Sequence, residues 1–375
     1  MKKLLFSFFV LTVSFLSSAN DAMAVLGECV DRDGNLVISA LGKTGDATFE
    51  DEEGNDIGAV FTYSGGYLGE NDDADANHCN AQPDEYKVKF FKTAICTLDP
   101  FKGNADPDFS SCIDIFNNGE GKDIIITKGG ADVSLLEGDL AIPLGEYPYL
   151  VVVVSNHLRI KHQQKFVNVL ADNTRAVMYG NGDTGTNTNT DLCYTVDTVT
   201  TYSGHTYNSA YLSAQQANHG SAFSIIASQA GADTSTLKCT SDATPGADFD
   251  FATEIIDHMG DFNTGLIASQ EYESNDDPLI ADIEMAATML QNDNASVATH
   301  ENNAQRIAGF FKYDNPIMIS EATEGFKLNF ATTQSVSIDS SQDMGNNKIW
   351  MVKVGADPFT VKVETQTKRS RGAWR

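Results

Sequence analysis

Positively charged residues are scarce in this sequence of 375 residues. Lys and Arg number 25 against 52 Asp and Glu, which gives a formal net charge of −27. A surface so short of positive charge repels nucleic acid and anionic lipid, and it favours divalent cations or basic partners. After residue 24, no apolar run approaches the ~18 residues that a membrane-spanning helix needs. We therefore expect neither a nucleic-acid partner nor a transmembrane anchor.

Catalytic signatures are missing as well. The sequence contains no H-E-x-x-H, no G-x-S-x-G, no G-x-x-x-x-G-K-[ST] and no G-x-G-x-x-G opening a helix after a strand. The seven histidines are scattered, and the five-residue spacing of His157 and His162 would turn them to opposite faces of one strand. We therefore expect no enzyme and no histidine metal site. A hydrolase that uses carboxylates stays an alternative, because such groups need no local signature.

The first 24 residues have the layout of an export leader. Two lysines precede an apolar run from Leu4 to Leu16, and Ala22-Met23-Ala24 supplies the small-x-small pattern that signal peptidase reads. Residues 1–24 are therefore predicted to be a signal peptide, with the mature chain beginning at Val25. This prediction places the protein outside the cytoplasm, as a secreted, cell-surface or periplasmic protein.

Six cysteines follow the leader, at Cys29, Cys79, Cys96, Cys112, Cys193 and Cys239. An even number in an exported protein predicts three disulfide bonds, although six cysteines allow fifteen pairings. We predict sequential pairing: Cys29 with Cys79, Cys96 with Cys112, and Cys193 with Cys239. The absence of C-x-x-C spacing disfavours redox chemistry and a zinc site.

Period-two alternation recurs along the chain and predicts half-buried strands, for example at 86–90 and 326–330. The connections are rich in Gly, Asn, Asp and Ser, which tolerate tight turns. We therefore predict a mainly β protein of one or two antiparallel β-sandwich modules, immunoglobulin-like or jelly-roll-like. Further strands are expected at 36–40, 60–63, 124–127, 150–155, 157–169, 176–179, 193–199, 307–311, 317–320, 335–339, 349–354 and 359–364.

Only a small part of the sequence predicts helix. Apolar residues recur with helical spacing from Leu279 to Leu290, after two aspartates suited to a helix start. A short helical insertion is therefore predicted around 278–291, and residues 252–260 are predicted to form a shorter helix. Both are expected to lie over a sheet as crossover elements.

Residues 180–191 are low in complexity and contain no apolar side chain. They are typical of an interdomain linker or of a long exposed loop. If they form a linker, the chain divides into an N-terminal β-sandwich module at 25–179 and a C-terminal β-rich module at 192–365. A basic tail at 366–375 follows.

The segment from Leu136 to Tyr147, with the strand after it, resembles immunoglobulin-like and prealbumin-like β-sandwich modules of bacterial surface proteins. In those modules a P-x-G-x-Y phrase leads into a core strand, and here the phrase is Pro143, Gly145 and Tyr147. The ring of Tyr147 is expected to be buried and its hydroxyl to bond nearby backbone, as in a tyrosine corner. The resemblance implies a sandwich and assigns no activity.

Acidic loops supply the candidate metal ligands, which are Asp51, Glu53, Asp72, Asp73, Asp75, Asp106 and Asp108. Calcium takes six to eight oxygen ligands in flexible geometry, which such loops can provide. The segment Asp31–Asn35 starts like an EF-hand loop but carries glycine at its fourth position, and a hairpin turn explains it better. Calcium is therefore the candidate cofactor, and solvated loops without metal are the alternative.

The C-terminus is basic on an otherwise acidic chain. Its charge predicts head-to-tail docking on a neighbouring subunit, through Lys368, Arg369, Arg371, Trp374 and Arg375. The strand at 359–364, with Phe359, Val361 and Val363, is expected to complete an open sheet edge of that neighbour. A disordered tail is the alternative.

These features favour a secreted, non-enzymatic structural protein that assembles with copies of itself into a filament, a pilus-like fibre or a surface layer. The first alternative is a calcium-dependent adhesion module that binds surface glycans or another ligand. Exposed Tyr202, Tyr207 and Tyr211 would then stack on sugar rings. A secreted hydrolase is the second alternative.

Overall fold

The computed structural model describes residues 35–40, 61–63, 78–128, 142–169, 177–179, 192–202, 207, 209–226, 237–240, 242–259, 269–274, 282–332, 335–342, 349–356 and 359–367. Most of them lie in strands, and the largest sheet is mainly antiparallel, so the prediction of a mainly β protein is confirmed. The predicted leader and the segment 180–191 lie outside these residues. Among the residues described, no helix has the length and apolar character needed to cross a membrane.

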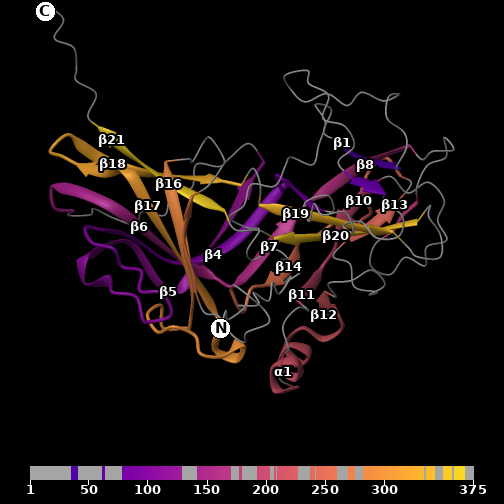
Figure 1. Cartoon of the computed structure of the whole chain (residues 1–375), viewed down its shortest axis with the longest axis horizontal. Coiled ribbons are helices and arrows are strands. Elements are labelled where there is room, and N and C mark those ends of the chain that lie inside the picture. Colours follow the sequence, from indigo (N-terminus) through magenta and orange to yellow (C-terminus); the bar gives the residue numbers. More distant parts are fainter. Residues whose placement is uncertain are drawn as a thin grey trace, which may run out of the picture.

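The largest sheet is built around one long strand pair (Figure 1). β4 (Glu85–Cys96) pairs along one edge with β5 (Cys112–Thr127). Its other edge pairs first with β6 (Gly145–Ser155) and then with β7 (His157–Lys161). β6 and β7 therefore act as one extended strand, interrupted only at Asn156.

This extended strand carries two partner strands placed end to end on its free edge. β6 pairs with β17 (Arg306–Ile319), and β7 pairs with β14 (Ala252–Ile255). One arm continues from β17 through β16 (Ile283–Leu290) to β15 (Ser269–Ser274), and the other continues from β14 through β11 (Thr198–Tyr202) to β12 (Phe223–Ile226). The sheet therefore forks at Asn156, and we call this point the fork.

Three smaller sheets occur among the described residues. A five-stranded sheet has the order β13 (Leu237–Thr240), β10 (Leu192–Thr195), β8 (Gln163–Val169), β1 (Asn35–Ala40) and β2 (Phe61–Tyr63). A four-stranded sheet has the order β3 (His78–Ala81), β19 (Val336–Gln342), β20 (Ile349–Ala356) and β9 (Val177–Tyr179), and β18 (Thr323–Ala331) pairs with β21 (Thr360–Thr367). Strands from both sides of 180–191 share the two largest sheets, so the predicted division at that segment does not separate the sheets.

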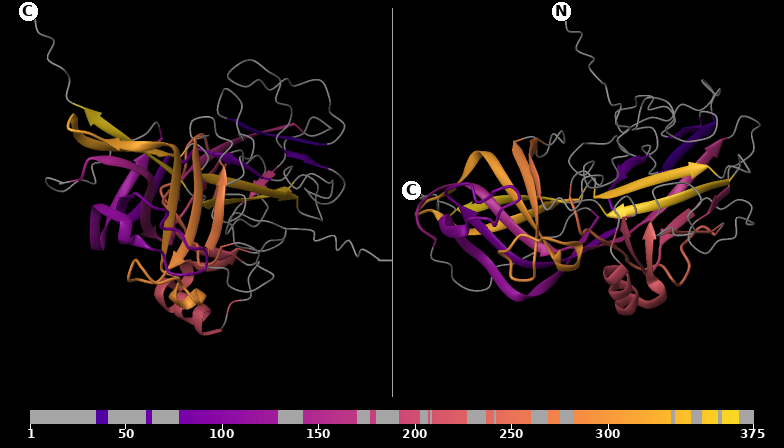
Figure 2. Two further views of the ribbon diagram at one scale, coloured as in Figure 1. Left: turned by 60° about the vertical axis from the view of Figure 1, so that its left-hand side comes forward. Right: turned by 60° about the horizontal axis from the view of Figure 1, so that its bottom comes forward.

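The helix α1 (Ser209–His219) connects β11 and β12, which are parallel neighbours. Parallel neighbours cannot be joined by a tight hairpin and need a crossover, which is commonly helical. Figure 1 shows α1 below β11 and β12, and in both views of Figure 2 the helix projects from the lower side of the molecule. Leu212 of α1 packs against Val199, Phe223 and Ile255 of this arm.

The largest sheet buries apolar side chains on both of its faces. Successive residues of β6 alternate between two clusters of buried side chains, with Leu150 in the first and Val151 in the second. The first cluster includes Phe359, whose ring centroid lies 5.4 Å from that of Tyr86. The second is covered by loop residues that include Phe101. Burial on both faces explains the unbroken apolar run at 150–154.

The helix predicted around 278–291 is wrong, because residues 283–290 form β16. β16 lies between β15 and β17 and buries side chains on both faces, among them Ile283, Met285, Ala286 and Met289. The apolar positions of two buried faces together imitate a helical period. The helix predicted at 252–260 is also wrong, since 252–255 form the four-residue strand β14, which is buried throughout.

The strand predicted over 157–169 is divided at His162 into β7 and β8. The His162 N–H donates to Thr195 Oγ1 at 3.1 Å, and the Thr195 N–H donates to the His162 carbonyl at 2.9 Å. This corner passes the chain from the largest sheet to the five-stranded sheet. His162 is buried, and this burial lowers its pKa to about 4.

Tyr147, the tyrosine of the P-x-G-x-Y phrase, has the environment that the sequence predicts. Tyr147 is buried, and its hydroxyl donates to the Pro143 carbonyl at 2.9 Å. The predicted bond from this hydroxyl to nearby backbone is therefore confirmed. A sandwich arrangement and the wider resemblance to immunoglobulin-like modules stay predictions.

The strand predicted to be donated to a neighbour is paired within its own chain. β21 pairs antiparallel with β18, and Phe359, Val361 and Val363 are buried. Donation would remove these side chains from the core, and assembly through this strand stays a prediction. The tail residues Lys368, Arg369, Arg371, Trp374 and Arg375 lie outside the described residues.

Two of the three predicted disulfides are present, Cys96–Cys112 and Cys193–Cys239. Each joins residues directly opposite one another on antiparallel strands, the first between β4 and β5 and the second between β10 and β13. Cys79 lies in β3, and its predicted bond to Cys29 falls outside the described residues. Disulfide bonds are typical of oxidising compartments.

Removing the Cys193–Cys239 bond should cost more stability than removing Cys96–Cys112. The two bonds span 46 and 16 residues of sequence. In the chain-entropy model the losses are about 4 and about 3 kcal/mol respectively. Denaturant unfolding of the C193A/C239A and C96A/C112A variants measures both. An equal loss, or a greater loss for the shorter loop, would show that loop entropy does not set these contributions.

Acid should destabilise the fold in a pH window to which buried His162 contributes. Its folded pKa of about 4 lies below the ordinary value of 6.5, so the unfolded chain binds the proton more readily. The stability from this group is full above pH 6.5 and is lost, by about 3 kcal/mol, as the pH falls towards 4. Urea unfolding at pH 7.5 and pH 4.5 measures this loss. The H162F variant cannot take up the proton and should lose correspondingly less; an identical loss would rule out His162 as the source.

Candidate functional site

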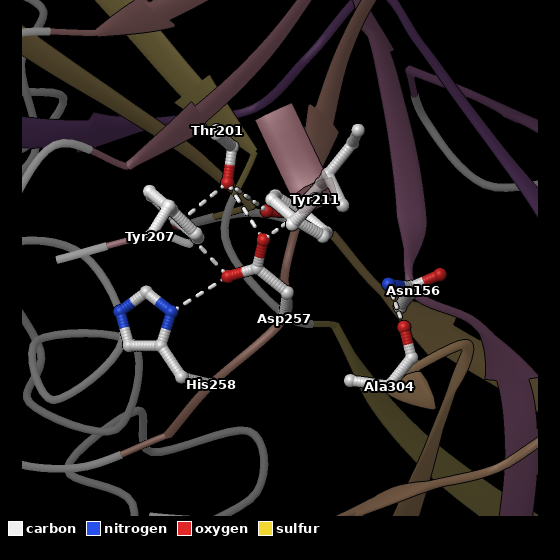
Figure 3. A network of polar contacts seen from close by, with 8 residues as sticks. Asn156, Thr201, Tyr207, Tyr211, Asp257, His258 and Ala304 are labelled. Atoms are coloured by element: carbon white, nitrogen blue, oxygen red, sulfur yellow. Dashed lines mark hydrogen bonds and ion pairs between the residues drawn. The ribbon is translucent and has the colours of Figure 1, made fainter. Parts of the chain in front are cut away.

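The fork is held by one buried residue, Asn156. Its N–H donates to the Gln305 carbonyl just before β17, at 3.2 Å, and its carbonyl accepts from the Ile256 N–H just after β14, at 2.9 Å. Its side-chain Nδ2 donates to the Ala304 carbonyl at 2.9 Å (Figure 3). Both arms therefore meet the extended strand at the same residue. The segment before β17 and the segment after β14 lie beside Asn156 and contribute to the candidate site.

The segment after β14 places a fully buried carboxyl group, that of Asp257, behind this site. Figure 3 shows four side chains converging on it. Thr201 Oγ1 and Tyr207 OH each donate to it at 2.9 Å, and His258 Nδ1 contacts it at 2.7 Å. The Tyr211 hydroxyl is the fourth donor. We call these five residues the Asp257 cluster.

The Asp257 cluster has the character of an anchor. A carboxylate offers about four lone-pair sites, and four partners occupy them. These partners come from β11, the segment before α1, α1 itself and the segment after β14, so one carboxyl group ties four pieces of chain together. Burial, followed by the proximity of Asp257, raises the pKa of Tyr207 and of Tyr211, which keeps both hydroxyls protonated as donors.

A pocket of about 660 Å³ opens in front of the cluster, between the fork and α1. The fork contributes Asn156 and His157. The segment before β17, which includes the short 3₁₀ helix η5 (Glu301–Asn303), contributes polar groups on the second side. The helix α1 forms the third side with the stripe Ala210, Tyr211, Ala214, Gln215, Asn218 and His219.

The pocket wall is polar and nearly uncharged. Burial and the neighbouring His219 lower the pKa of His157 to about 4, and burial also lowers the pKa of His219. Both imidazoles are therefore neutral near pH 7, with ring centroids 5.7 Å apart. Among the described residues that line the pocket, Glu301 is the single acidic one, and none is Lys or Arg.

The two predicted calcium ligands that the structure describes serve other purposes. Asp106 Oδ1 accepts from the Val297 N–H at 2.8 Å, and Asp108 Oδ1 accepts from the Ser110 N–H at 3.0 Å as the cap of the 3₁₀ helix η2 (Phe109–Ser111). Among the residues described, no group of three or more His, Cys, Asp and Glu side chains is arranged to hold a metal ion. The remaining candidates Asp51, Glu53, Asp72, Asp73 and Asp75 lie outside those residues, and calcium binding stays a prediction.

Two of the three tyrosines expected to be exposed for sugar stacking, Tyr207 and Tyr211, are instead packed against each other. Tyr211 is buried, and its ring stacks on Tyr207 with centroids 5.0 Å apart. The side chain of Tyr202 lies outside the described residues. Sequence reasoning also missed α1 itself, although residues 209–219 contain Ala, Leu and Gln without Gly, Pro or β-branched residues, which favours helix.

Comparison with models of known protein families, with curated proteins and with solved structures finds no match to this chain. The functional proposals below therefore rest on the chain's own residues.

Replacing Tyr211 by Phe should destabilise the protein more than replacing Tyr147 by Phe. Each change removes one hydroxyl from a buried ring, but Tyr211 donates to a carboxyl group and Tyr147 to a backbone carbonyl. Hydrogen bonds to charged groups contribute about 1.5–3 kcal/mol and neutral ones about 0.5–1.5 kcal/mol. Urea unfolding of Y211F and Y147F tests this order. A Y211F loss no greater than the Y147F loss would contradict the anchoring role of Asp257.

Proposed function

We propose that this chain is an exported, non-enzymatic protein that binds a small polar ligand in the pocket between the fork and α1. The observation that carries the proposal is the pocket itself, a concave site of about 660 Å³ walled by three separate chain segments. Binding sites for small molecules are commonly concavities of this size at junctions between structural units.

The side chains behind the pocket support binding over catalysis. The Asp257 carboxyl has its acceptor sites occupied by four partners, so it has no remaining site for a substrate proton. His258, which would be the general base of an Asp–His pair, is only 5 % exposed. A general base must reach the proton that it removes, and this ring is enclosed.

Rigid support of the pocket also favours a binding role. The Asp257 cluster fixes α1, and the Nδ2 bond from Asn156 to Ala304 fixes the segment that carries η5. A wall whose positions are set before the ligand arrives loses little conformational entropy on binding. The export leader predicted at 1–24 and the two disulfides support a location outside the cytoplasm.

A tryptophan placed in the pocket should abolish ligand binding without unfolding the protein. Ala214 is exposed on the pocket stripe of α1, whereas its exposed neighbour Ser213 is not part of the lining, so A214W fills the pocket and S213W is the matched control. The probes are saccharides, amino acids, polyamines, nucleotides and organic acids, and the measurement is the melting temperature. A ligand at 100 times its Kd contributes about 2.7 kcal/mol to stability.

At least one probe class should raise the melting temperature of the unmodified protein and of S213W, but not that of A214W. The proposal fails if no class raises the melting temperature of the unmodified protein. It also fails if A214W responds as strongly as S213W does.

A further inference from the structure

The pocket wall presents hydrogen-bond donors and acceptors in balance. A side-chain amide carries an NH₂ donor and a carbonyl acceptor, and a neutral imidazole carries one N–H donor and one acceptor nitrogen. Groups that can both donate and accept, which we call two-way groups, lie on all three sides of the pocket: His157, Gln215, Asn218, His219, Asn302 and Gln305. A ligand that satisfies them must also both donate and accept.

Ligands with a full charge fit this wall poorly. A carboxylate or phosphate only accepts hydrogen bonds, and it would face Glu301 and a chain of net charge −27 with no cationic partner among the lining residues that the structure describes. An ammonium group only donates, so it leaves the amide and imidazole N–H groups of the wall without acceptors. Unsatisfied polar groups are costly once water is excluded.

Apolar and aromatic ligands fit no better. Among the described lining residues, Tyr211 has the one phenyl-type ring; it is 3 % exposed and is stacked on Tyr207, so its face is not open to the pocket. The apolar contacts on α1 are the two methyl groups of Ala210 and Ala214. Recognition therefore depends on hydrogen bonds, with small apolar contacts along one side.

We infer that the pocket takes a neutral, polyhydroxylated ligand, a saccharide of one or two rings. This inference rests on the proposed binding function and names the ligand class for the same pocket. A hydroxyl group donates one hydrogen bond and accepts others, which matches the two-way groups of the wall. The C–H edges of a sugar ring match the alanine methyl groups of α1.

The test compares neutral saccharides with relatives that carry a charged amino or carboxyl group in place of a hydroxyl or hydroxymethyl group. Glucose, galactose, mannose, N-acetylglucosamine and their common disaccharides are titrated at pH 7.5 with ligand-observed NMR, together with glucosamine, galactosamine, glucuronic acid and galacturonic acid. At least one neutral sugar should bind, and its charged counterparts should bind about tenfold or more weakly, because each leaves wall groups unpaired. Equal or tighter binding of a charged counterpart, or no binding of any neutral sugar, overturns the inference.

A pair of variants on α1 gives a second readout. N218D replaces a two-way amide in the lining by an acceptor-only carboxylate, and A217D places a carboxylate on the neighbouring exposed residue, which is outside the lining. N218D should weaken binding of the neutral sugar by about tenfold and shift preference towards the amino sugar, whereas A217D should bind as the unmodified protein does. Equal effects of the two variants would show that general charge, and not the wall, sets specificity.

Failure of the ligand class is distinguishable from failure of the proposed function. If a probe other than a saccharide raises the melting temperature of S213W but not of A214W, the pocket binds and only the saccharide assignment falls. If nothing binds in a manner that A214W blocks, the binding function itself falls.

Discussion

The arrangement of this protein depends on how one extended strand satisfies its backbone at Asn156. β6 and β7 share an edge of β4, and their free edge is covered by two strands that cannot meet end to end without a gap. Buried backbone groups must be paired, and Asn156 pairs its N–H with one arm and its carbonyl with the other. The chain must therefore enter β17 and leave β14 beside the same residue. That constraint brings distant parts of the sequence to one place.

The parts of the fold that could be predicted from sequence are those set by local chemistry. The alternating strands and the Tyr147 hydroxyl bond depend on residues that are close together in the sequence. Two of the disulfides could be predicted from the even number of cysteines and their order along the chain. β16 was missed because both of its faces are buried, which erases the period-two signal. The short helix α1 was missed because it carries little apolar periodicity and is needed only to join two parallel strands, a fact of topology.

The candidate site was beyond sequence reasoning for a related reason. The partners of Asp257 on β11 and α1 stand about fifty positions earlier, Thr201 by 56 residues and Tyr211 by 46. No local motif links them, because the strand pairing that aligns β11 with β14 makes the contact. The acidic loops drew attention by density of charge, yet Asp106 and Asp108 each accept from a backbone N–H of their own chain. The sequence showed where carboxylates are dense, but the fold determines which groups each carboxylate contacts.

The unit formed by β11, α1 and β12 stands at one end of the largest sheet, with β12 as the outermost strand of that arm. Its parallel pairing contrasts with the antiparallel ribbon of β4, β5 and β6 that carries the main core. Exposed positions such as Ala214 and Asn218 therefore belong to a peripheral unit of the fold. Exchanges at these two positions would leave the central ribbon of β4, β5 and β6 intact, so the wall of the pocket can change while the frame of the fold stays the same. Divergent copies of such a chain would be expected to differ most at exposed stripe positions such as Ala214 and Asn218, and least at Tyr211, which belongs to the Asp257 cluster.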